Sequence, residues 1–399
     1  MSESTAVYPN NLKTWEFGKE GPQNFCSERE TIAGRQGASE NGDSEVNPTS
    51  PKTKSSSCLG KITTIIPTYK RPKLLRRALS SVLRQTYPYF EVHVYDNASG
   101  DETEEVVNEF REKDARVKYH QHPENIGMMG NYEFAMKEVK TPYFSVLSDD
   151  DLVLPWFFET ALKGFESFPE VAFSAASTLI MSEKGEIVRV PLDFWPKEGF
   201  FSSVEGLTEM ISKYPIPTCI LFRKEVIDEV PIDRGNVLTW DCDFLLQVAA
   251  RHPIFISKRP CGIFLHHDTS YSNAQTFNKW QDALKRISKR IEALEFLPAT
   301  AKMGAINLID NDLKICNRSF IIIHLVNKRF EESFNCAKLF RETYGDSFDS
   351  LILLISSKIC CLFPLFVRLL LLIRNVKMLK KAKLFRSYVQ YAKWLWEFQ

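Results

Sequence analysis

The sequence predicts an α/β protein in which helices flank a mostly parallel sheet. Three observations lead to this fold class: β-branched apolar runs recur, segments of helical spacing separate them, and polar clusters follow several of the runs. Strands separated by helices form parallel sheets that are covered on both faces. With 399 residues, of which 44% are hydrophobic and 25% charged, the chain is long enough to bury a sizeable core.

The predicted elements begin after residues 1–58, a leader rich in Ser, Thr, Glu, Asn and Gly. Its apolar content is too low to offset the entropy of ordering, so we expect it to be disordered. The run "KITTIIPTY" then suits a buried strand. The next stretch, "RPKLLRRALSSVLRQT", has helical spacing and tolerates Pro72 in its first turn.

The same alternation continues to residue 148. We expect strands at "FEVHVYD", "VKYHQH" and "YFSVLS", and helices at "DETEEVVNEFREK" and from Tyr132 to Val139. We predict a sheet domain over residues 59–272 and a helical extension over 273–348. Residues 349–399 are predicted to form amphipathic, basic helices.

Three polar clusters fall at the carboxyl ends of the predicted strands: "PTYKR", "DNASGDE" and "DDD". Ligands bind outside this edge of an open parallel sheet. In an extended segment Asp149 and Asp151 would point the same way and Asp150 elsewhere. Carboxylates are hard ligands for Mg²⁺ or Mn²⁺. The alternative is that Asp151 caps the helix that follows.

The stretches "TIIPTYKRPKLLRRALSSVLRQTYPYFEVHVYDNASGDET", "ENIGMMGNYEFAMK", "FSVLSDDDLVLP", "TCILFRKEV" and "WDCDFLLQVA" resemble the family 2 glycosyltransferases, which have the GT-A fold. The resemblance runs from about Ile62 to Ser272 and follows the order and spacing of the family. It implies a nucleotide-sugar donor, with UDP as the default nucleotide, and Mg²⁺ or Mn²⁺ as cofactor.

The resemblance also implies roles for particular residues. Those implied to hold the nucleotide-sugar are Pro67, Thr68, Tyr69, Arg71, Asp96, Asn97, Ser99, Asn125, Gly127, Asn131 and Asp150, with Asp96 reading the base. Asp149 and Asp151 are implied to bind the metal that bridges the diphosphate, joined by His267 from "HDTSYS". A histidine after an apolar strand can equally be structural. The sequence departs from the family at Ser148, where Asp is frequent, and at "MGN", where "ARN" is frequent.

Sugar transfer needs a base for the acceptor hydroxyl, and Asp241 and Asp243 are the candidates. At about 100° per residue, Asp241 lies among the apolar positions of its helix, whereas Asp243 lies nearly opposite and is expected to face solvent. The "ED" motif of the family matches Trp240 and Asp241. The alternative is that Asp241 only caps the helix.

The end of the chain carries a long apolar stretch that Lys358, Pro364 and Arg368 interrupt, followed by basic and aromatic residues. This composition suits helices lying on a membrane surface. A packed helical hairpin is the alternative. The nine cysteines form no CxxC pair, which indicates reduced thiols and a cytoplasmic protein. The basic and aromatic end of the chain adds the expectation of a peripheral location on the cytoplasmic face of a membrane.

Together these features predict an inverting, metal-dependent glycosyltransferase that moves a single sugar to an acceptor hydroxyl. The acceptor would be a glycan or a lipid-linked molecule, in glycan or cell-surface polysaccharide synthesis. Nucleic acid is not expected as a partner, because the net charge is only +1. The alternatives are a nucleotidyltransferase and a non-catalytic membrane-binding protein that keeps the fold.

Overall fold

The computed structural model describes residues 60–266, 277–326 and 330–345. All described residues belong to one unit, which spans Cys58–Gln399. The predicted leader, His267 and the predicted helices of residues 349–399 lie outside the described residues.

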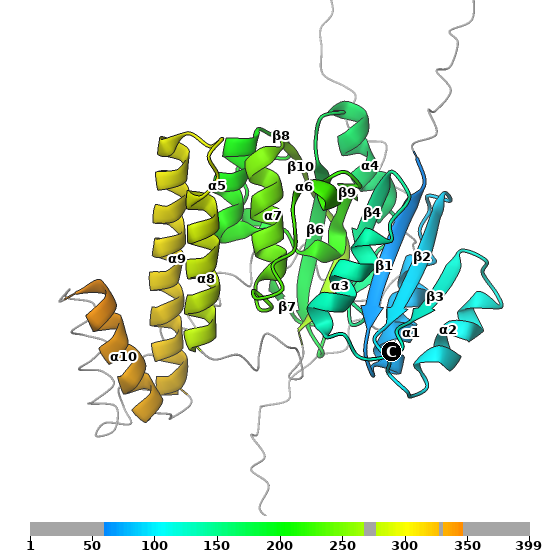
Figure 1. Cartoon of the computed structure of the whole chain (residues 1–399), viewed down its shortest axis with the longest axis horizontal. Coiled ribbons are helices and arrows are strands. Elements are labelled where there is room, and N and C mark those ends of the chain that lie inside the picture. Colours follow the sequence, from blue (N-terminus) through cyan, green and yellow to red (C-terminus); the bar gives the residue numbers. More distant parts are fainter. Residues whose placement is uncertain (1–59, 267–276, 327–329, 346–399) are drawn as a thin grey trace, which may run out of the picture. The chain divides into compact units, whose positions relative to one another are not determined.

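The first half of the described chain alternates strands and helices as the sequence predicts (Figure 1). The strands are β1 (Ile62–Thr68), β2 (Phe90–Asp96), β3 (Val117–Gln121) and β4 (Tyr143–Val146). The helices are α1 (Pro72–Val82), α2 (Thr103–Arg111) and α3 (Met128–Lys137). All four strands run parallel, in the order β3-β2-β1-β4.

The second half of the sheet is mixed. Its strands are β5 (Leu152–Val153), β6 (Phe173–Ser182), β7 (Ile187–Arg189), β8 (Gly199–Phe201), β9 (Ile220–Arg223) and β10 (Ile254–His266). The helices are α4 (Phe157–Ser167), α5 (Ser203–Lys213), α6 (Val226–Glu229) and α7 (Trp240–Arg251), with short 3₁₀ turns at Pro191–Phe194 and Pro217–Cys219. β9 lies antiparallel between β4 and β6, while β6 and β10 are parallel.

Two apolar cores cover the two faces of this sheet. Ile65 and Ile66 are adjacent on β1 and therefore point to opposite faces. Ile66 packs in a core with Leu79 of α1 and Phe158 of α4. Ile65 packs in a core that includes residues of α3, α5 and α7. The structure thus confirms the predicted α/β class, a mostly parallel sheet flanked by helices.

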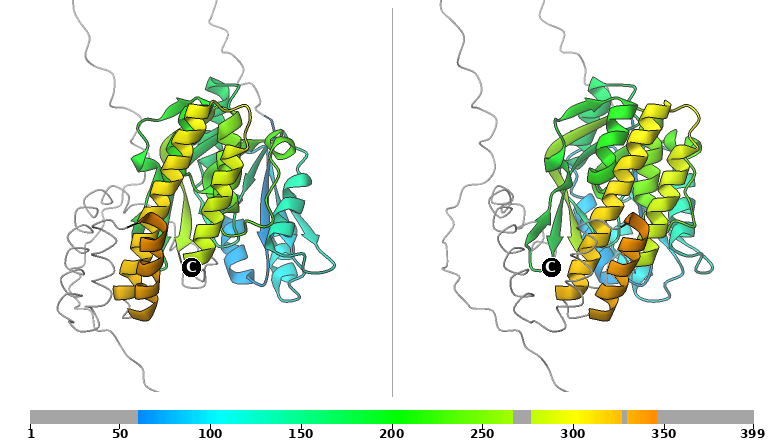
Figure 2. Two further views of the ribbon diagram at one scale, coloured as in Figure 1. Left: turned by 60° about the vertical axis from the view of Figure 1, so that its left-hand side comes forward. Right: turned by 90° about the vertical axis from the view of Figure 1, so that its left-hand side faces the viewer.

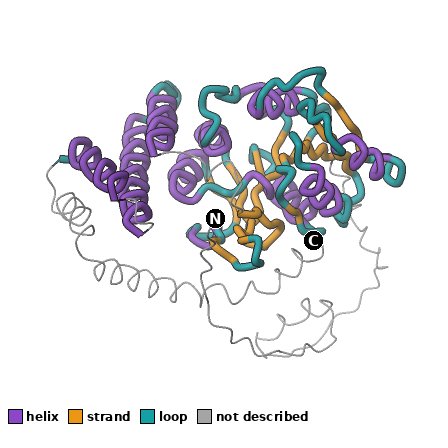
Figure 3. Tube along the Cα trace, turned by 90° about the horizontal axis from the view of Figure 1, so that it is seen from below, coloured by secondary structure: helices purple, strands orange, loops and turns teal. Residues whose placement is uncertain are grey.

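Three further helices form the predicted extension: α8 (Phe277–Glu292), α9 (Ala299–Val326) and α10 (Phe330–Tyr344). Figures 1 and 2 show α8 and α9 lying side by side, and α9 also contacts α5. Ile287 and Ile291 of α8 belong to the same apolar core as residues of α7. Figure 3 shows helices gathered to one side of the strands. None of the helices in the described residues combines the length and the apolar character needed to cross a membrane.

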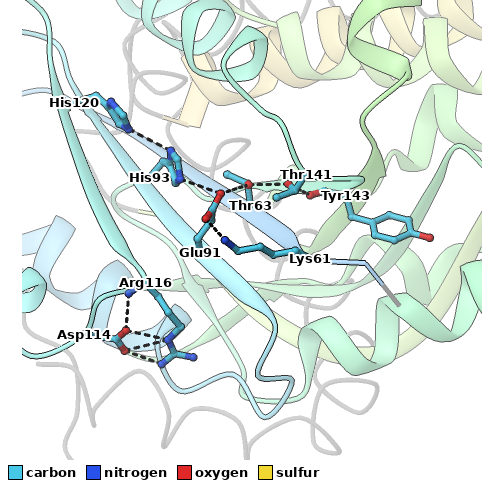
Figure 4. A network of polar contacts seen from close by, with 9 residues as sticks. All are labelled: Lys61, Thr63, Glu91, His93, Asp114, Arg116, His120, Thr141 and Tyr143. Atoms are coloured by element: carbon cyan, nitrogen blue, oxygen red, sulfur yellow. Dashed lines mark hydrogen bonds and ion pairs between the residues drawn. The ribbon is translucent and has the colours of Figure 1, made fainter. Parts of the chain in front are cut away.

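A polar network joins β1, β2 and β3 toward the end of the strands that lies opposite the polar clusters (Figure 4). Glu91 of β2 accepts hydrogen bonds from Lys61 and from the hydroxyl of Thr63, which also contacts Thr141 at 2.7 Å. His93 pairs with Glu91 and lies 3.2 Å from a ring nitrogen of His120. Burial lowers the pKa of both histidines. The network ties the three strands to the segment that enters β4.

Candidate functional site

A pocket of about 240 Å³ opens at the carboxyl ends of β1 and β2, beside the turn after β4. It is lined by Pro67, Thr68, Tyr69, Arg71, Asn97, Asn125, Met128, Asn131, Tyr132 and Asp149. All of these except Met128 and Tyr132 are residues for which the sequence predicts a ligand-binding role. Ligands of open α/β sheets bind at this edge, so the pocket is the candidate site.

The two unpredicted residues lie one turn apart on the same side of α3. The sequence pattern predicts that this helix begins at Tyr132, but it begins at Met128. The polar turn "ENIG" immediately before the helix is the signal that could have found them, because a helix that leaves a binding turn presents its first residues to the ligand.

Three asparagines line the pocket with amide orientations that backbone partners fix. Asn97 accepts a hydrogen bond from the backbone N–H of Ile126 at 2.9 Å and donates one to Asn125 Oδ1 at 3.0 Å. Asn125 Oδ1 also accepts from the N–H of Gly127 at 2.8 Å. Asn131 donates to the carbonyl of Tyr95 at 2.9 Å, and its Oδ1 lies 3.0 Å from Nε2 of His122. The side-chain oxygens are therefore engaged, and the amide protons that remain are donors available to a ligand.

Asp96 does not line the pocket, although the sequence resemblance gives it the base. It is 1% exposed and accepts hydrogen bonds from Ser99 and, at 2.7 Å, from the hydroxyl of Tyr119. Ser99 in turn accepts a bond from the backbone N–H of Lys70 at 2.9 Å. Asp96 and Ser99 thus shape the loops that carry Tyr69 and Asn97, and Asn97 is the neighbour that faces the pocket.

Gly127 also acts through the backbone. Its φ is +78°, a left-handed conformation that other residues adopt only with strain. This conformation lets the turn after Asn125 lead directly into α3, which carries Asn131. Gly127 therefore shapes the pocket without lining it.

The acidic turn after β4 brings together a different pair of carboxylates from the predicted one. Arg71 Nη1 donates to Asp149 at 3.2 Å and to Asp150 at 2.9 Å. Asp151 points away: it accepts bonds from the hydroxyl of Thr218 and from the N–H of Leu265. The expected convergence of Asp149 and Asp151 is wrong, because Asp151 N–H bonds to the carbonyl of Ser148 and closes a turn where an extended strand was expected.

Burial dominates the electrostatics of this turn. Burial and the neighbouring Asp150 raise the pKa of Asp149 to about 6, against the opposing effects of Arg71 and the Thr68 hydroxyl. Burial and Asp150 also raise the pKa of Asp151 well above its usual value. Both carboxylates would therefore gain from a further positive charge.

The pair Asp149 and Asp150 fits a divalent cation. Mg²⁺ is commonly held by one or two carboxylates together with phosphate oxygens of a substrate. The two side chains already converge on one cationic nitrogen, that of Arg71. Within the ranges that the structure describes, no three His, Cys, Asp or Glu side chains are arranged to hold a metal.

Asp241 lies at the start of α7, next to the pocket wall. The ring of Trp240 lies 4.7 Å from that of Tyr132, centroid to centroid, so the pocket and the α7 start share an aromatic contact. Asp241 is half-buried and lines a small cavity with Phe244 and Leu245. Burial raises its pKa to about 6, although N–H groups of its own helix oppose the shift. This suits a base that is ionised at neutral pH.

Asp243 is buried, so the prediction that it faces solvent is wrong. Only 2% of its side chain is exposed, and it accepts a hydrogen bond from Arg290 of α8 at 2.9 Å. Burial raises its pKa to about 6, and Arg290 acts in the opposite direction. The helical wheel of α7 could not show that α8 covers Asp243, because the contact is made by a residue far along the chain.

A model of the family described as "Glycosyl transferase family 2" matches residues 63–231. An uncharacterized glycosyltransferase of Methanocaldococcus jannaschii is 22% identical over 47% of this chain and 64% of its own length. One from Rickettsia bellii is 36% identical over 58% of this chain and 32% of its own. A Campylobacter jejuni glucosyltransferase, named for GalNAc(5)-diNAcBac-PP-undecaprenol, is 30% identical over 26% of this chain and 34% of its own. The chain thus spans less than two thirds of these relatives.

Two solved structures share the fold. Residues 1–349 of Staphylococcus aureus TarS, in complex with UDP-GlcNAc, match at a TM-score of 0.56 and 15% identity, over 75% of this chain and 88% of that one. The mannosyltransferase PcManGT of Pyrobaculum calidifontis, in complex with GDP-Man and Mn²⁺, matches at 0.50 and 15% identity, over 85% and 86%. At this identity the likeness concerns the fold alone.

Proposed function

The chain belongs to glycosyl transferase family 2 through residues 63–231, and from this we propose that it transfers a single sugar from a nucleotide-sugar to an acceptor hydroxyl. The observation that carries the proposal is the pocket itself. Asparagine donors, a carboxylate pair and Arg71 meet there, and the half-buried Asp241 lies beyond its aromatic wall.

The donor would occupy the pocket at the ends of β1 and β2. The amide protons of Asn97 and Asn125 suit the acceptor atoms of a nucleobase. Asp96 would stabilise the loop that carries Asn97 by accepting a hydrogen bond from the N–H of Ser99. Arg71 suits the diphosphate. UDP is the default nucleotide, and a guanine nucleotide is the first alternative to test, because the two solved structures carry UDP-GlcNAc and GDP-Man.

Asp149 and Asp150 would hold Mg²⁺ or Mn²⁺. Asp151 would fix the turn after β4 through its hydrogen bond with the Thr218 hydroxyl. When bound, the cation neutralises charge that develops on the leaving diphosphate. The role predicted for His267 falls outside the described residues and is not part of this assignment.

Asp241 would take the proton of the acceptor hydroxyl as the hydroxyl attacks the anomeric carbon. One base and one displacement invert the configuration of the sugar. A glycan or a lipid-linked glycan is the proposed acceptor, which the name of the Campylobacter relative supports. Inversion is tested by following the anomeric proton of the first product by NMR, and a product that retains the configuration of the donor would contradict it.

The donor site is tested by thermal stability with UDP, GDP, CDP and dTDP, each with and without Mn²⁺. A nucleotide at 100 times its Kd should add about 2.7 kcal/mol to the free energy of unfolding. We expect the gain with one nucleotide to depend on Mn²⁺ and to be lost in Asp150→Asn. The matched control is Asp228→Asn, whose carboxylate is 74% exposed on α6. No gain with any nucleotide would contradict the proposed donor site.

A further inference from the structure

The helix α8 lies beyond the residues that the family model matches, yet it contacts the start of α7. The guanidinium of Arg290 on α8 bridges two carboxylates: Nη1 lies 2.9 Å from Asp243 Oδ2 and Nη2 lies 3.5 Å from Asp233 Oδ2. Asp243 belongs to the first turn of α7, two residues after Asp241. Asp233 belongs to the loop that leads into this helix.

This bridge compensates a buried charge. Asp243 is 2% exposed, and burial opposes its charge while Arg290, Gln247 and Asn236 stabilise it. A buried carboxylate that loses its cation costs far more than an exposed ion pair contributes. The planar guanidinium of Arg also places a separate nitrogen on each carboxylate, a geometry that the ammonium of Lys does not reproduce. Arg290 therefore determines where the first turn of α7 can lie.

The same loop is held from both sides. On the α8 side, a Cβ placed on Gly235 would lie only 2.7 Å from Arg286, one helical turn before Arg290, so the loop packs closely against α8. On the opposite side, Arg234 donates to Glu133 of α3. α3 carries Asn131 and Tyr132 of the donor pocket, and Tyr132 contacts Trp240 at the start of α7.

Within the loop, side chains bond to the backbone and to one another. Asp233 Oδ1 accepts from the N–H of Gly235 at 2.9 Å, and the Thr239 hydroxyl donates to Asn236 at 2.9 Å. The N–H of Asp243 then bonds to the carbonyl of Thr239 at 2.9 Å and begins α7. A displacement of the loop would therefore displace the helix start.

We propose that Arg290 is a positioning residue, which sets the distance between the donor pocket and Asp241 by clamping Asp243 and Asp233 to α8. This inference depends on the proposed function for the role of Asp241. It makes the helical extension part of the active-site architecture of this chain, although the extension itself contributes no group to the reaction.

Two measurements on the full chain test this proposal. The first is hydrogen exchange in Arg290→Gln: we expect exchange on the order of tenfold faster over residues 233–245, with β1 to β4 unchanged. The second is the release of nucleoside diphosphate from the best donor, which should fall about 10- to 100-fold because the base is misplaced. The Kd of the free nucleotide should stay within twofold of the wild-type value.

Matched variants separate positioning from general stability. Lys289→Gln removes a neighbouring exposed charge of α8 and should change none of these values. Arg290→Lys should give intermediate values. Exchange over residues 233–245 that stays at the wild-type rate, or that rises equally throughout the domain, would overturn the proposal. If the wild type released no nucleoside diphosphate from any donor, the proposed function would fail, while the exchange data would still decide whether Arg290 holds the loop.

Discussion

Single side chains determine what the pocket can recognise. The carboxylate of Asp96 already accepts hydrogen bonds from Ser99 and Tyr119 and does not line the pocket. The part of the pocket beside β2 is therefore lined by neutral amides. Amides fixed by backbone partners offer N–H groups in set directions, and a ligand then loses little entropy in finding them. The carboxylates and Arg71 lie at the other side of the pocket. We infer that one side contacts the base and the other the diphosphate.

The variant Asn97→Ala tests the amide side. It removes the acceptor for the Ile126 N–H and the donor to Asn125. An acceptor atom of the bound nucleobase would then lose its amide donor, and an unsatisfied polar group costs about 1–3 kcal/mol, so we expect the Kd for the preferred nucleotide to rise about 10-fold. Isothermal titration calorimetry measures this, with Asn108→Ala on α2 as the control. An unchanged Kd would show that this side of the pocket does not contact the nucleotide.

Asp241 gives the expected pH dependence of turnover. A base works in its ionised form, and burial raises the pKa of this carboxylate to about 6. Turnover should therefore be constant above pH 7 and fall tenfold per pH unit well below pH 6. The measurement is kcat at saturating donor and metal, which avoids the titration of Asp149 in the free enzyme. A rate that stays constant down to pH 5 would contradict the assignment of Asp241.

Turns, rather than strands, set the site geometry. The turn at Asp149 and Asp150 decides which carboxylates meet, and the turn at Gly127 decides where α3 begins. Sequence periodicity predicts strands and helices well, because their side-chain spacing is regular. It predicts turns poorly, because one backbone hydrogen bond, such as that from Asp151 to Ser148, redirects every side chain nearby.

Substitutions at two glycines distinguish the effect of the left-handed turn before α3 from that of ordinary helix propensity. In Gly127→Ala the new Cβ meets nothing within 4 Å, so the cost is the left-handed backbone alone, about 1–2 kcal/mol. We expect lower stability in urea and weaker nucleotide binding. In Gly304→Ala, on α9, the Cβ also meets nothing, and we expect a gain of about 0.5–1 kcal/mol from reduced chain entropy and better helix propensity. Equal effects of the two substitutions would contradict the role of the Gly127 turn.

The fold of the whole domain follows from local pattern more fully than the site does. The alternation of strands and helices over residues 62–146 predicts four parallel strands, and the structure has them. The antiparallel β9 between β4 and β6 could not be predicted, because its position depends on pairing between distant segments. The buried contact of Asp243 with Arg290 was missed for the same reason: it joins residues 47 positions apart.

The central claim is that this domain transfers sugar from the pocket at the ends of β1 and β2. The most direct measurement is the release of nucleoside diphosphate from a panel of UDP-, GDP-, CDP- and dTDP-sugars with Mn²⁺. Wild type, Asp150→Asn, Asp241→Asn and the exposed control Asp228→Asn would be compared. We predict release from one nucleotide class by the wild type and the control, and a loss of at least about 100-fold in the other two. Equal release by all four proteins, or none by the wild type with any donor, would contradict the account.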